Sequence, residues 1–343
     1  MQPEILTERE HRVLEAIIHN FVLSAAPTSS RYISKLNGFD LSPASIRNVM
    51  FDLEERGFIT QPHTSAGRIP TDKGYRYYVD RLMKYTGLPP DVKNQIRSAL
   101  VTADQADLHL LLEAASSALG RVTNQLGVIL APKLCNGKLS QLYVFPIESQ
   151  RFLLTIALES GFVKNMVIEF HTHLPMECLE CACRILTTKF KGKTIQQMCD
   201  ADETNFRDIG DLELGVVRLL VPSIKKLFEA GEKSQVFLEG KTNVLLQPEF
   251  FSKDRIGAVI EILEEKKLLM HLFDTSHDKT GIVITIGGEN NKGQLQSFSI
   301  IKTNYNIGSM VGSLGVIGPK RMPYPYLISV VEYTAKVIGE LHS

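Results

Sequence analysis

The segment Ser42-Pro-Ala-Ser-Ile-Arg-Asn-Val-Met-Phe-Asp-Leu-Glu-Glu55 decides the fold predicted for the N-terminal part of the chain. Ser42 and Pro43 are residue types that helices prefer at the N-cap and at the first helical position, and Gly57 is typical of a helix end. Four apolar residues recur at helical spacing and form one inward stripe: Ile46, Val49, Met50 and Leu53. The segment is therefore predicted to be an amphipathic helix.

The opposite face of this helix carries residues that suit DNA. At about 100° per residue, that face consists of Ala44, Arg47, Asn48 and Phe51. Arginine reads guanine and asparagine reads adenine through bidentate hydrogen bonds in the major groove. An ordinary solvated helix face would carry similar residues, so this pattern alone leaves both interpretations open.

Two more helices are predicted before this segment. Thr7-Glu-Arg-Glu10 has the pattern of a capping box, and the apolar residues from Val13 to Val22 follow it at helical spacing. Pro27-Thr-Ser-Ser30 ends this first helix and caps a short second one, which ends at Asn37-Gly38.

The residues after Gly57 predict a hairpin. Two short extended pieces, Phe58-Ile-Thr60 and Ile69-Pro-Thr71, flank the loop Gln61-Pro-His-Thr-Ser-Ala-Gly-Arg68. Arg68, at the loop exit, is placed to enter a minor groove or to contact phosphate. Three helices followed by such a hairpin predict a winged helix-turn-helix domain.

The run Lys73-Gly-Tyr-Arg-Tyr-Tyr78 interleaves cations with aromatic residues. Its lysine, arginine and tyrosine side chains can all donate hydrogen bonds to phosphate oxygens. The alternative is that Tyr75, Tyr77 and Tyr78 pack the helix back onto the domain. The predicted DNA-contacting residues are Ser42, Ala44, Ser45, Arg47, Asn48, Phe51, His63, Thr64, Ser65, Arg68, Lys73, Tyr75 and Arg76.

The overall charge gives DNA binding no general support. Lys plus Arg and Asp plus Glu are both 38, so the net charge is zero. Electrostatic attraction to nucleic acid must then come from a local patch. Between Gly57 and Lys84, five basic residues stand against two acidic ones, a local excess of three.

Length and composition describe an ordinary globular protein. The chain has 343 residues, of which 44% are hydrophobic and 22% charged, enough for two or three domains. No apolar run is long enough to span a membrane, and the acidic N-terminus does not look like a secretory signal. Five cysteines, an odd number, do not suggest a disulfide framework. We therefore expect a cytoplasmic protein.

Several motifs resemble a known family. The runs Leu41 to Met50 and Gln61 to Asp80, above all Pro62-His-Thr-Ser-Ala-Gly-Arg68, resemble the heat-inducible transcription repressor HrcA family of bacteria. Gly318-Pro-Lys-Arg-Met322 before a C-terminal helix is similar to the closing segment of that family. Phe51 departs from the pattern, because the family usually has a small residue at this position.

The rest of the chain predicts sheets interrupted by helices. A helical stripe runs from Leu108 to Leu126, and three runs with short turns predict an antiparallel meander: Leu139–Ile147, Arg151–Glu159 and Phe162–Phe170. Helices are expected at Pro175–Phe190, Asp211–Ala230, Ser252–Leu272 and Tyr324–Leu341. Further strands are expected at Val236–Leu238, Gly281–Ile286, Gln296–Lys302 and Ser309–Gly315. This order predicts a multidomain α+β protein.

The resemblance implies how these elements are divided. It implies a winged helix in residues 1–84, a linker at 85–92, a GAF-like α/β domain in 93–172 and 245–343, and an inserted dimerisation domain in 173–244. It also implies a homodimer that binds the inverted-repeat operator CIRCE upstream of chaperone operons. The GroEL chaperonin would support the repressor's activity, and heat stress would release it from DNA. No cofactor and no metal are implied.

A two-fold dimer also has a physical motive. One winged helix contacts few base pairs, and this chain has no global positive charge. Two copies would present two recognition helices to an inverted repeat, so that the half-site free energies combine.

Three other functions compete with repression. Cys178, Cys181, Cys183 and Cys199 near His171 and His173 could bind metal. Ordinary packing is the favoured interpretation, because the second Cys pair of a zinc site is missing. A GAF-like domain could instead hold a ligand and make the protein a ligand- or metal-responsive winged-helix regulator. The glycines at 287–293 and at 312–318 suit a hairpin turn and tight strand packing better than nucleotide loops. No common catalytic motif indicates an enzyme.

Overall fold

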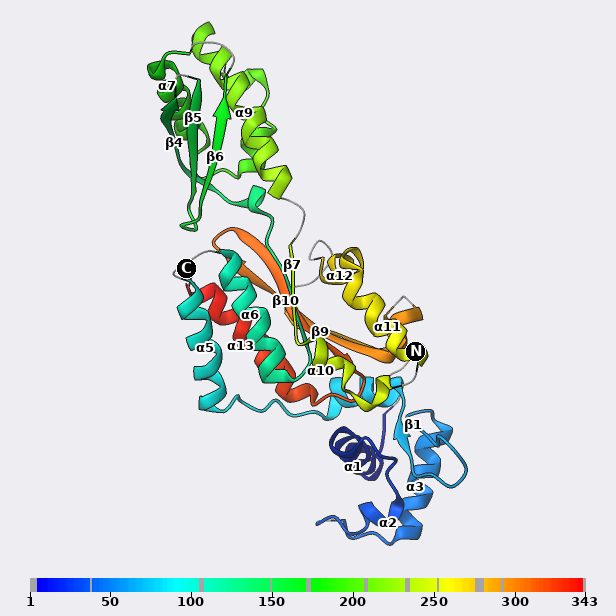
Figure 1. The fold of residues 1–343 in the computed structure, drawn as a ribbon. Helices are drawn as coiled ribbons and strands as arrows, with labels where there is room; N and C mark the ends of the chain where they lie inside the picture. Colours follow the sequence, from blue (N-terminus) through cyan, green and yellow to red (C-terminus); the bar gives the residue numbers. More distant parts are fainter. Residues whose placement is uncertain are drawn as a thin grey trace.

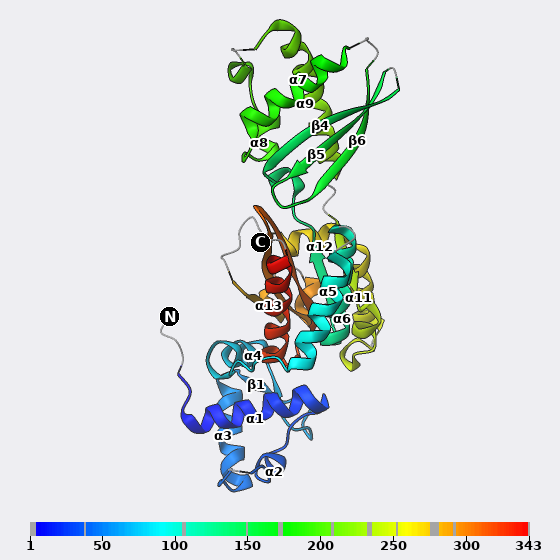
Figure 2. The ribbon, with the colours of Figure 1, turned by 90° about the vertical axis from the view of Figure 1, so that its left-hand side faces the viewer.

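A computed structural model describes residues 5–37, 39–104, 108–148, 150–170, 174–206, 209–231, 235–251, 253–274, 281–290 and 293–341. The molecule is elongated and consists of three units stacked along one axis (Figures 1 and 2). We call them the N-terminal unit (5–84), the central unit (85–133 and 235–341), and the inserted unit (134–231). The central unit contains a five-stranded sheet. The mixture of helices and sheets confirms the predicted α+β class.

The N-terminal unit contains the predicted three helices and hairpin. Its helices are α1 (Glu8–Ser24), α2 (Ser30–Ile33) and α3 (Pro43–Glu55), and its strands are β1 (Ile59–Thr60) and β2 (Ile69–Pro70). The capping box is confirmed, because Thr7 and Glu10 satisfy each other's backbone N–H at the start of α1. After β2 the chain forms α4 (Asp72–Tyr77) and a π-helical turn at Tyr78–Leu82.

The central unit is built on an antiparallel sheet with the strand order β7-β3-β10-β9-β8. These strands are β3 (Leu126–Leu130), β7 (Val236–Glu239), β8 (Val283–Ile286), β9 (Phe298–Ile307) and β10 (Met310–Pro319). The glycine series in β10 packs tightly against neighbouring strands, as predicted. A Cβ at Gly315 would lie 2.1 Å from the Ile301 carbonyl oxygen.

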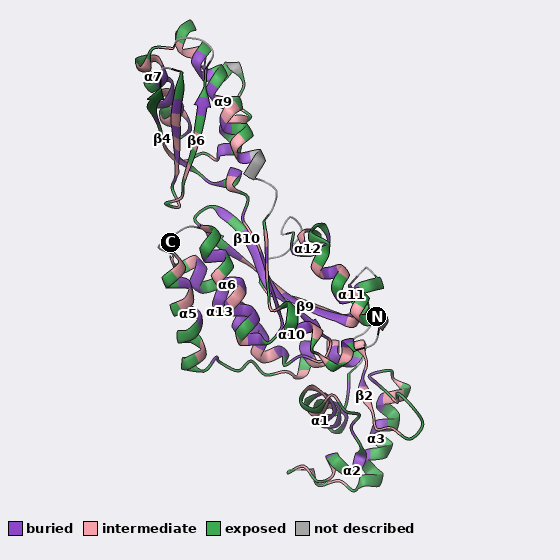
Figure 3. Ribbon diagram, viewed as in Figure 1, coloured by how far each residue is buried: buried purple, intermediate pink, exposed green. Residues whose placement is uncertain are grey.

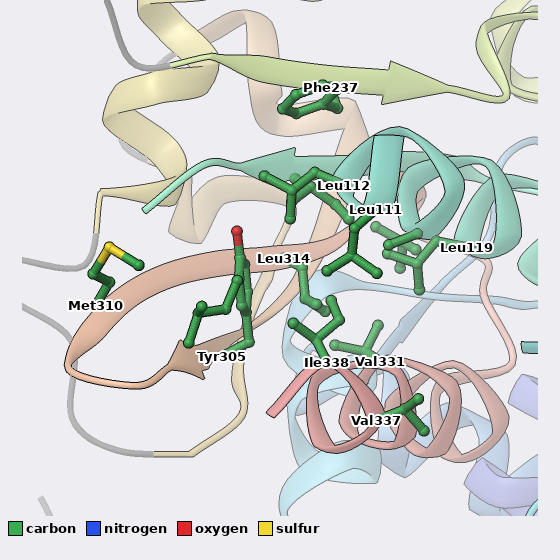
Figure 4. Close-up of a cluster of buried hydrophobic side chains, with 14 of the residues drawn as sticks. Leu111, Leu112, Leu119, Phe237, Tyr305, Met310, Leu314, Val331, Val337 and Ile338 are labelled. Atoms are coloured by element: carbon green, nitrogen blue, oxygen red, sulfur yellow. The ribbon is translucent and has the colours of Figure 1, made fainter. Parts of the chain in front are cut away.

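Helices cover both faces of this sheet (Figure 1). One face is covered by α6 (Leu108–Thr123) and α13 (Tyr324–Leu341), on which α5 (Pro90–Asp104) packs. The other face is covered by α10 (Lys241–Leu245), α11 (Lys253–Glu264) and α12 (Lys266–Phe273). In β3, Ile129 faces the first core while Leu126 and Val128 face the second, because successive strand residues point to opposite sides. Figure 4 shows part of the first core, where Leu111, Leu119, Leu314 and Val331 meet.

The inserted unit has a separate three-stranded sheet with its own helices. The predicted meander is confirmed as β4 (Leu139–Glu148), β5 (Arg151–Leu158) and β6 (Val163–Glu169), paired antiparallel in that order. The helices α7 (Met176–Phe190), α8 (Ile195–Cys199) and α9 (Asp211–Gly231) complete the unit. Within it, α7 packs on β4 and on α9.

The predicted limits of the insertion, 173–244, need correction. The chain leaves the central sheet after β3 and returns in β7, and these two strands pair with each other, with Leu130 opposite Val236. The whole excursion therefore lies between them. Strands β4 to β6 pair with none of the five described central strands, so the boundary at 173 would separate this sheet from the helices that cover it.

The sequence prediction missed the helix α5 and the strand β3, and also the short helices α8 and α10. Pro89 and Pro90 suggested a linker through residue 92, but Pro90 is the first residue of α5, a position that proline favours. The helical stripe predicted to reach Leu126 ends earlier, because Asn124 takes a left-handed conformation with φ of 54°. Leu126 instead begins β3. The helix expected at Ser252–Leu272 is divided into α11 and α12 around Glu265.

Candidate nucleic-acid interface

The helix α3 presents the predicted face to solvent. Ile46, Met50 and Leu53 are buried against the rest of the N-terminal unit, and they fix the rotation of the helix. Ser42 caps the helix by accepting a hydrogen bond from the backbone N–H of Ser45 at 3.1 Å. The two serine hydroxyls also lie 3.0 Å apart. The start of α3 is thus ordered before any ligand arrives.

The four residues predicted on the outer face of α3 are all exposed: Ala44, Arg47, Asn48 and Phe51. The predicted contacts Ser42 and Ser45 at the start of the helix are exposed as well. Within the described part of the chain, Arg47 has no ion-pair partner. Phe51 is 55% exposed, which is unusual for a large aromatic side chain that has no partner surface. Together these side chains offer donors, an acceptor and an apolar contact on one helix face. Figure 3 colours much of α3 as exposed.

The hairpin loop is held by hydrogen bonds between its own residues. The Gln61 side-chain amide donates to the carbonyls of Thr64 and Ala66, both at 2.9 Å. His63, Thr64 and Ser65 are exposed at the tip. Gln61 was not among the predicted residues, although a side-chain amide at the start of a short polar loop is a signal for such a role.

The base of the hairpin is joined to the segment before α2. Thr28 and Arg68 exchange two backbone hydrogen bonds, at 2.8 and 2.9 Å. Gly67 permits this approach, since a Cβ there would lie 2.4 Å from the Thr28 carbonyl oxygen. Beside it, the Arg68 guanidinium pairs with Glu54 of α3 at 2.7 Å. Hairpin and α3 are therefore held together as one surface.

Two of the predicted contacts need correction. Tyr75 is only 1% exposed and packs against Tyr324 of the central unit, so it cannot contact DNA. Burial raises the pKa of its hydroxyl well above the ordinary value. Arg76 pairs with Glu289 of the central unit and donates to the Ile284 carbonyl at 2.7 Å, so it joins units rather than facing DNA. For Tyr75 the structure supports the packing alternative.

Lys73 remains exposed but has partners within the unit. Its ammonium donates to the Arg56 carbonyl at 2.7 Å and lies 4.4 Å from the Phe58 ring centroid. The local excess of basic residues seen in the sequence is therefore largely paired in the structure, through Arg68 and Arg76 above all.

The junction between the N-terminal and central units is a set of polar contacts that the sequence did not reveal. Asp72 pairs with Lys320 at 2.5 Å and accepts from the Gly288 backbone N–H at 2.9 Å. Gly287 has φ of 55°, and a Cβ there would lie 2.1 Å from the Asp72 carboxylate. The predicted turn at 287–293 lies in a hairpin connection, because residues 287–297 join the antiparallel strands β8 and β9. This connection contains two short 3-10 turns, with residues 291 and 292 outside the described residues.

The alternative metal site at the Cys and His residues between 171 and 199 receives no support from the residues that the structure describes. His171 and His173 lie outside the described residues. Among the residues that are described, no group of three His, Cys, Asp or Glu side chains is arranged to hold a metal ion. Burial raises the pKa of the Cys183 thiol to about 12, which keeps it protonated and unreactive at neutral pH. No described helix is long and apolar enough to cross a membrane.

Comparisons with known proteins agree over nearly the whole chain. The family model described as "HrcA protein C terminal domain" matches residues 109–328. The heat-inducible transcription repressor HrcA of Prosthecochloris aestuarii is 36% identical over 340 residues, with 96% of each chain covered. That of Acetivibrio thermocellus is 36% identical over 343 residues, covering 98% of this chain and 96% of its own. A crystal structure described as a hypothetical protein at 2.2 Å resolution has 26% identity and a TM-score of 0.64, and it covers 98% of this chain and 99% of its own.

These findings place the chain among transcription repressors and exclude an enzyme. It belongs to the HrcA family of heat-inducible transcription repressors, which confirms the resemblance noted in the sequence.

Proposed function

We propose that this chain represses heat-shock operons as a homodimer that inserts α3 into the major groove of an inverted-repeat operator. The observation that carries the proposal is the capped α3 with its exposed Arg47, Asn48 and Phe51. Phe51 would contact a thymine methyl group, and the two polar side chains would read base edges.

The N-terminal unit has the parts of a winged helix-turn-helix. The helices α2 and α3 pack against each other. The backbone pairing of Thr28 with Arg68, together with the strands β1 and β2, forms a minimal sheet. In this arrangement the loop at His63 to Ser65 is the wing, placed to contact the sugar-phosphate backbone or the minor groove. The central unit would then be the GAF-like domain.

Dimerisation through the inserted unit is supported by the free face of its sheet. Alternate residues on β4 and β6 are apolar and exposed, and they are Tyr143, Phe145, Ile147, Val163 and Val167. The helices cover only the other face. An exposed apolar sheet face of this kind marks a protein interaction site, and a second copy would bury it symmetrically.

The proposed operator and the proposed chaperonin partner both follow from family membership. We propose CIRCE as the inverted repeat, and GroEL as the chaperonin that keeps the repressor active until heat-denatured clients occupy it. Both assignments are carried by the similarity to HrcA proteins.

The direct test is a gel-shift titration of the purified chain on a CIRCE duplex and on a scrambled duplex of equal length. We expect tighter binding to CIRCE by at least about a thousandfold, which is the low end of the specificity ratios of DNA-binding regulators. Adding GroEL should increase the fraction of active repressor without changing the preference. Equal affinity for both duplexes, with GroEL present, would overturn the proposal.

A further inference from the structure

A pocket of about 370 Å³ lies between the central and inserted units, in the size range of small-molecule sites. Its walls come from both units. Leu108, His109 and Leu112 belong to α6 of the central unit, while Leu158 of β5 and Phe228 of α9 belong to the inserted unit.

The pocket lies at the hinge that connects the two units. The chain passes between the central and inserted units twice, and the two connecting segments meet at the pocket. The Ala131 backbone N–H of one segment donates to the Gln235 carbonyl of the other at 2.9 Å. A molecule held in this pocket would contact both units at once, and so would restrict their relative motion.

The lysines in the pocket give it a basic character, beside the neutral polar side chains of Asn165 and Gln235. Lys164 and Lys133 line it, and none of its described lining residues is acidic. The Lys164 ammonium lies 5.6 Å from the Phe228 ring centroid, and burial lowers its pKa. A partly desolvated ammonium of this kind is stabilised by an anion.

The remaining walls are apolar and include Leu112, Leu134, Leu158 and Phe228. An inorganic anion would pair with the Lys164 ammonium but would leave the apolar walls in contact with water. An uncharged hydrocarbon would do the reverse. The two kinds of surface together fit a molecule with one anionic head and an apolar tail.

We propose that the hinge pocket binds a small aliphatic carboxylate, with its head at Lys164 and its tail against the leucines of both units. This site is independent of the DNA-binding face and does not rest on the proposed function.

The test is calorimetric titration of the full chain with octanoate, with octan-1-ol and inorganic phosphate as partial mimics. We expect octanoate to bind at least about tenfold more tightly than either mimic, since each lacks one of the two interactions. Lys164→Met should weaken octanoate binding about tenfold, whereas Lys164→Arg should retain it. Lys191→Met, on the same unit but outside the pocket, is the matched control and should bind as the wild type does.

A second measurement does not depend on any variant folding. In the wild-type chain, octanoate should shift the methyl NMR signals of Leu112 and Leu158, one from each unit, and leave those of Leu53 in the N-terminal unit unchanged. The proposal is overturned if octanoate does not bind, if octan-1-ol binds as tightly, or if Lys164→Met binds octanoate like the wild type. Shifts confined to one unit would overturn the hinge assignment.

Discussion

At the scale of single residues, we expect recognition of the operator to depend on two exposed side chains, Arg47 and Asn48. Arg47 and Asn48 are exposed, and they sit on a helix whose rotation is fixed by buried neighbours. We predict that Arg47→Ala and Asn48→Ala each weaken operator binding by about 1–3 kcal/mol, because each removes a bidentate base contact. Fluorescence anisotropy on operator and scrambled duplexes at one salt concentration measures the difference.

The matched control for these two variants is Arg97→Ala, which alters an exposed arginine of α5 that pairs with Glu340 of α13 in the central unit. It should leave both affinities unchanged. Equal losses on the operator and the scrambled duplex for Arg47→Ala and Asn48→Ala would mean that these side chains contact phosphates and read no bases.

Tyr75 offers a different test, because its hydroxyl is buried and has no hydrogen-bond partner among the described residues. Tyr75→Phe should leave DNA binding unchanged and keep or raise stability by up to about 1 kcal/mol, since an unsatisfied polar group is removed. Tyr77→Phe is the contrasting variant. Its hydroxyl accepts from the Leu6 backbone N–H at 3.2 Å and lies 2.7 Å from the His11 ring nitrogen. The Tyr77→Phe variant should therefore lose about 1 kcal/mol of unfolding free energy, measured by chemical denaturation.

At the scale of elements, the cap of α1 makes the N-terminal unit sensitive to acid. Burial alone would raise the pKa of Glu10, but hydrogen bonds from Thr7 and Arg56 outweigh it and lower the pKa below the ordinary value of 4.5. The ionised carboxylate therefore stabilises the fold above that pH. The contribution is lost as the pH falls through the lower folded-state pKa.

We predict that Glu10→Gln destabilises the N-terminal unit by about 1 kcal/mol at neutral pH and flattens its stability profile below pH 4.5. Thermal unfolding followed as a function of pH measures both effects. Glu8→Gln, an exposed change in the same turn, should alter neither. An unchanged acid profile in Glu10→Gln would show that other carboxylates control the transition.

The elements that the sequence predicted well are those whose signals are local. The cap at Ser42, the stripe from Ile46 to Leu53 and the terminal helix at Tyr324–Leu341 each follow from neighbouring residues, and the structure confirms them. Strand β3 was missed because its apolar run continues the stripe of α6 in sequence. Only the left-handed Asn124 separates the two elements.

Long-range partners lay beyond sequence reasoning. Nothing near Arg76 in the chain shows that Glu289 will face it, so a cation among tyrosines was interpreted as a phosphate contact. In the same way, the strands at 139–169 have the pattern of a half-buried sheet, but that pattern does not say which helices cover them. Residue types and their periodicity predicted the exposed face of α3, whereas tertiary packing decided the roles of Tyr75 and Arg76.

At the scale of the whole molecule, the free sheet face of the inserted unit should control assembly. On this face, Phe145 of β4 is 50% exposed and stacks with Tyr143 at a centroid distance of 6.3 Å. Phe145→Glu should convert the dimer to a monomer in sedimentation experiments, because a charge would be buried in an apolar interface. Binding to the inverted repeat should fall while binding to one half-site persists.

Leu246→Glu is the control for Phe145→Glu, since it places the same charge at a residue that is 72% exposed on the central unit. It should leave the dimer intact. A dimer that survives Phe145→Glu would show that the two copies meet elsewhere.

In the proposed dimer, the contacts between the N-terminal and central units would set how the two copies of α3 are spaced. The hydrogen bond to Glu289 raises the pKa of Arg76 above its ordinary value, so the guanidinium stays charged and bound at any working pH. Arg321 reinforces the junction by donating to the Val22 carbonyl of α1 at 2.7 Å. In the proposed dimer, such contacts would hold each α3 at a defined angle to the dimer axis, which an inverted repeat with fixed half-site spacing requires.

We predict that Arg76→Gln lowers affinity for the full inverted repeat but leaves single half-site binding and the salt dependence unchanged. The reason is that the junction loosens while no phosphate contact is lost. Lys73→Gln, three residues away and exposed, should instead reduce the slope of log affinity against log salt by about one unit on every duplex. Titrations of both variants at several salt concentrations separate the two roles. A reduced salt slope in Arg76→Gln would return Arg76 to the DNA interface, because a residue that only joins the units displaces no counterions.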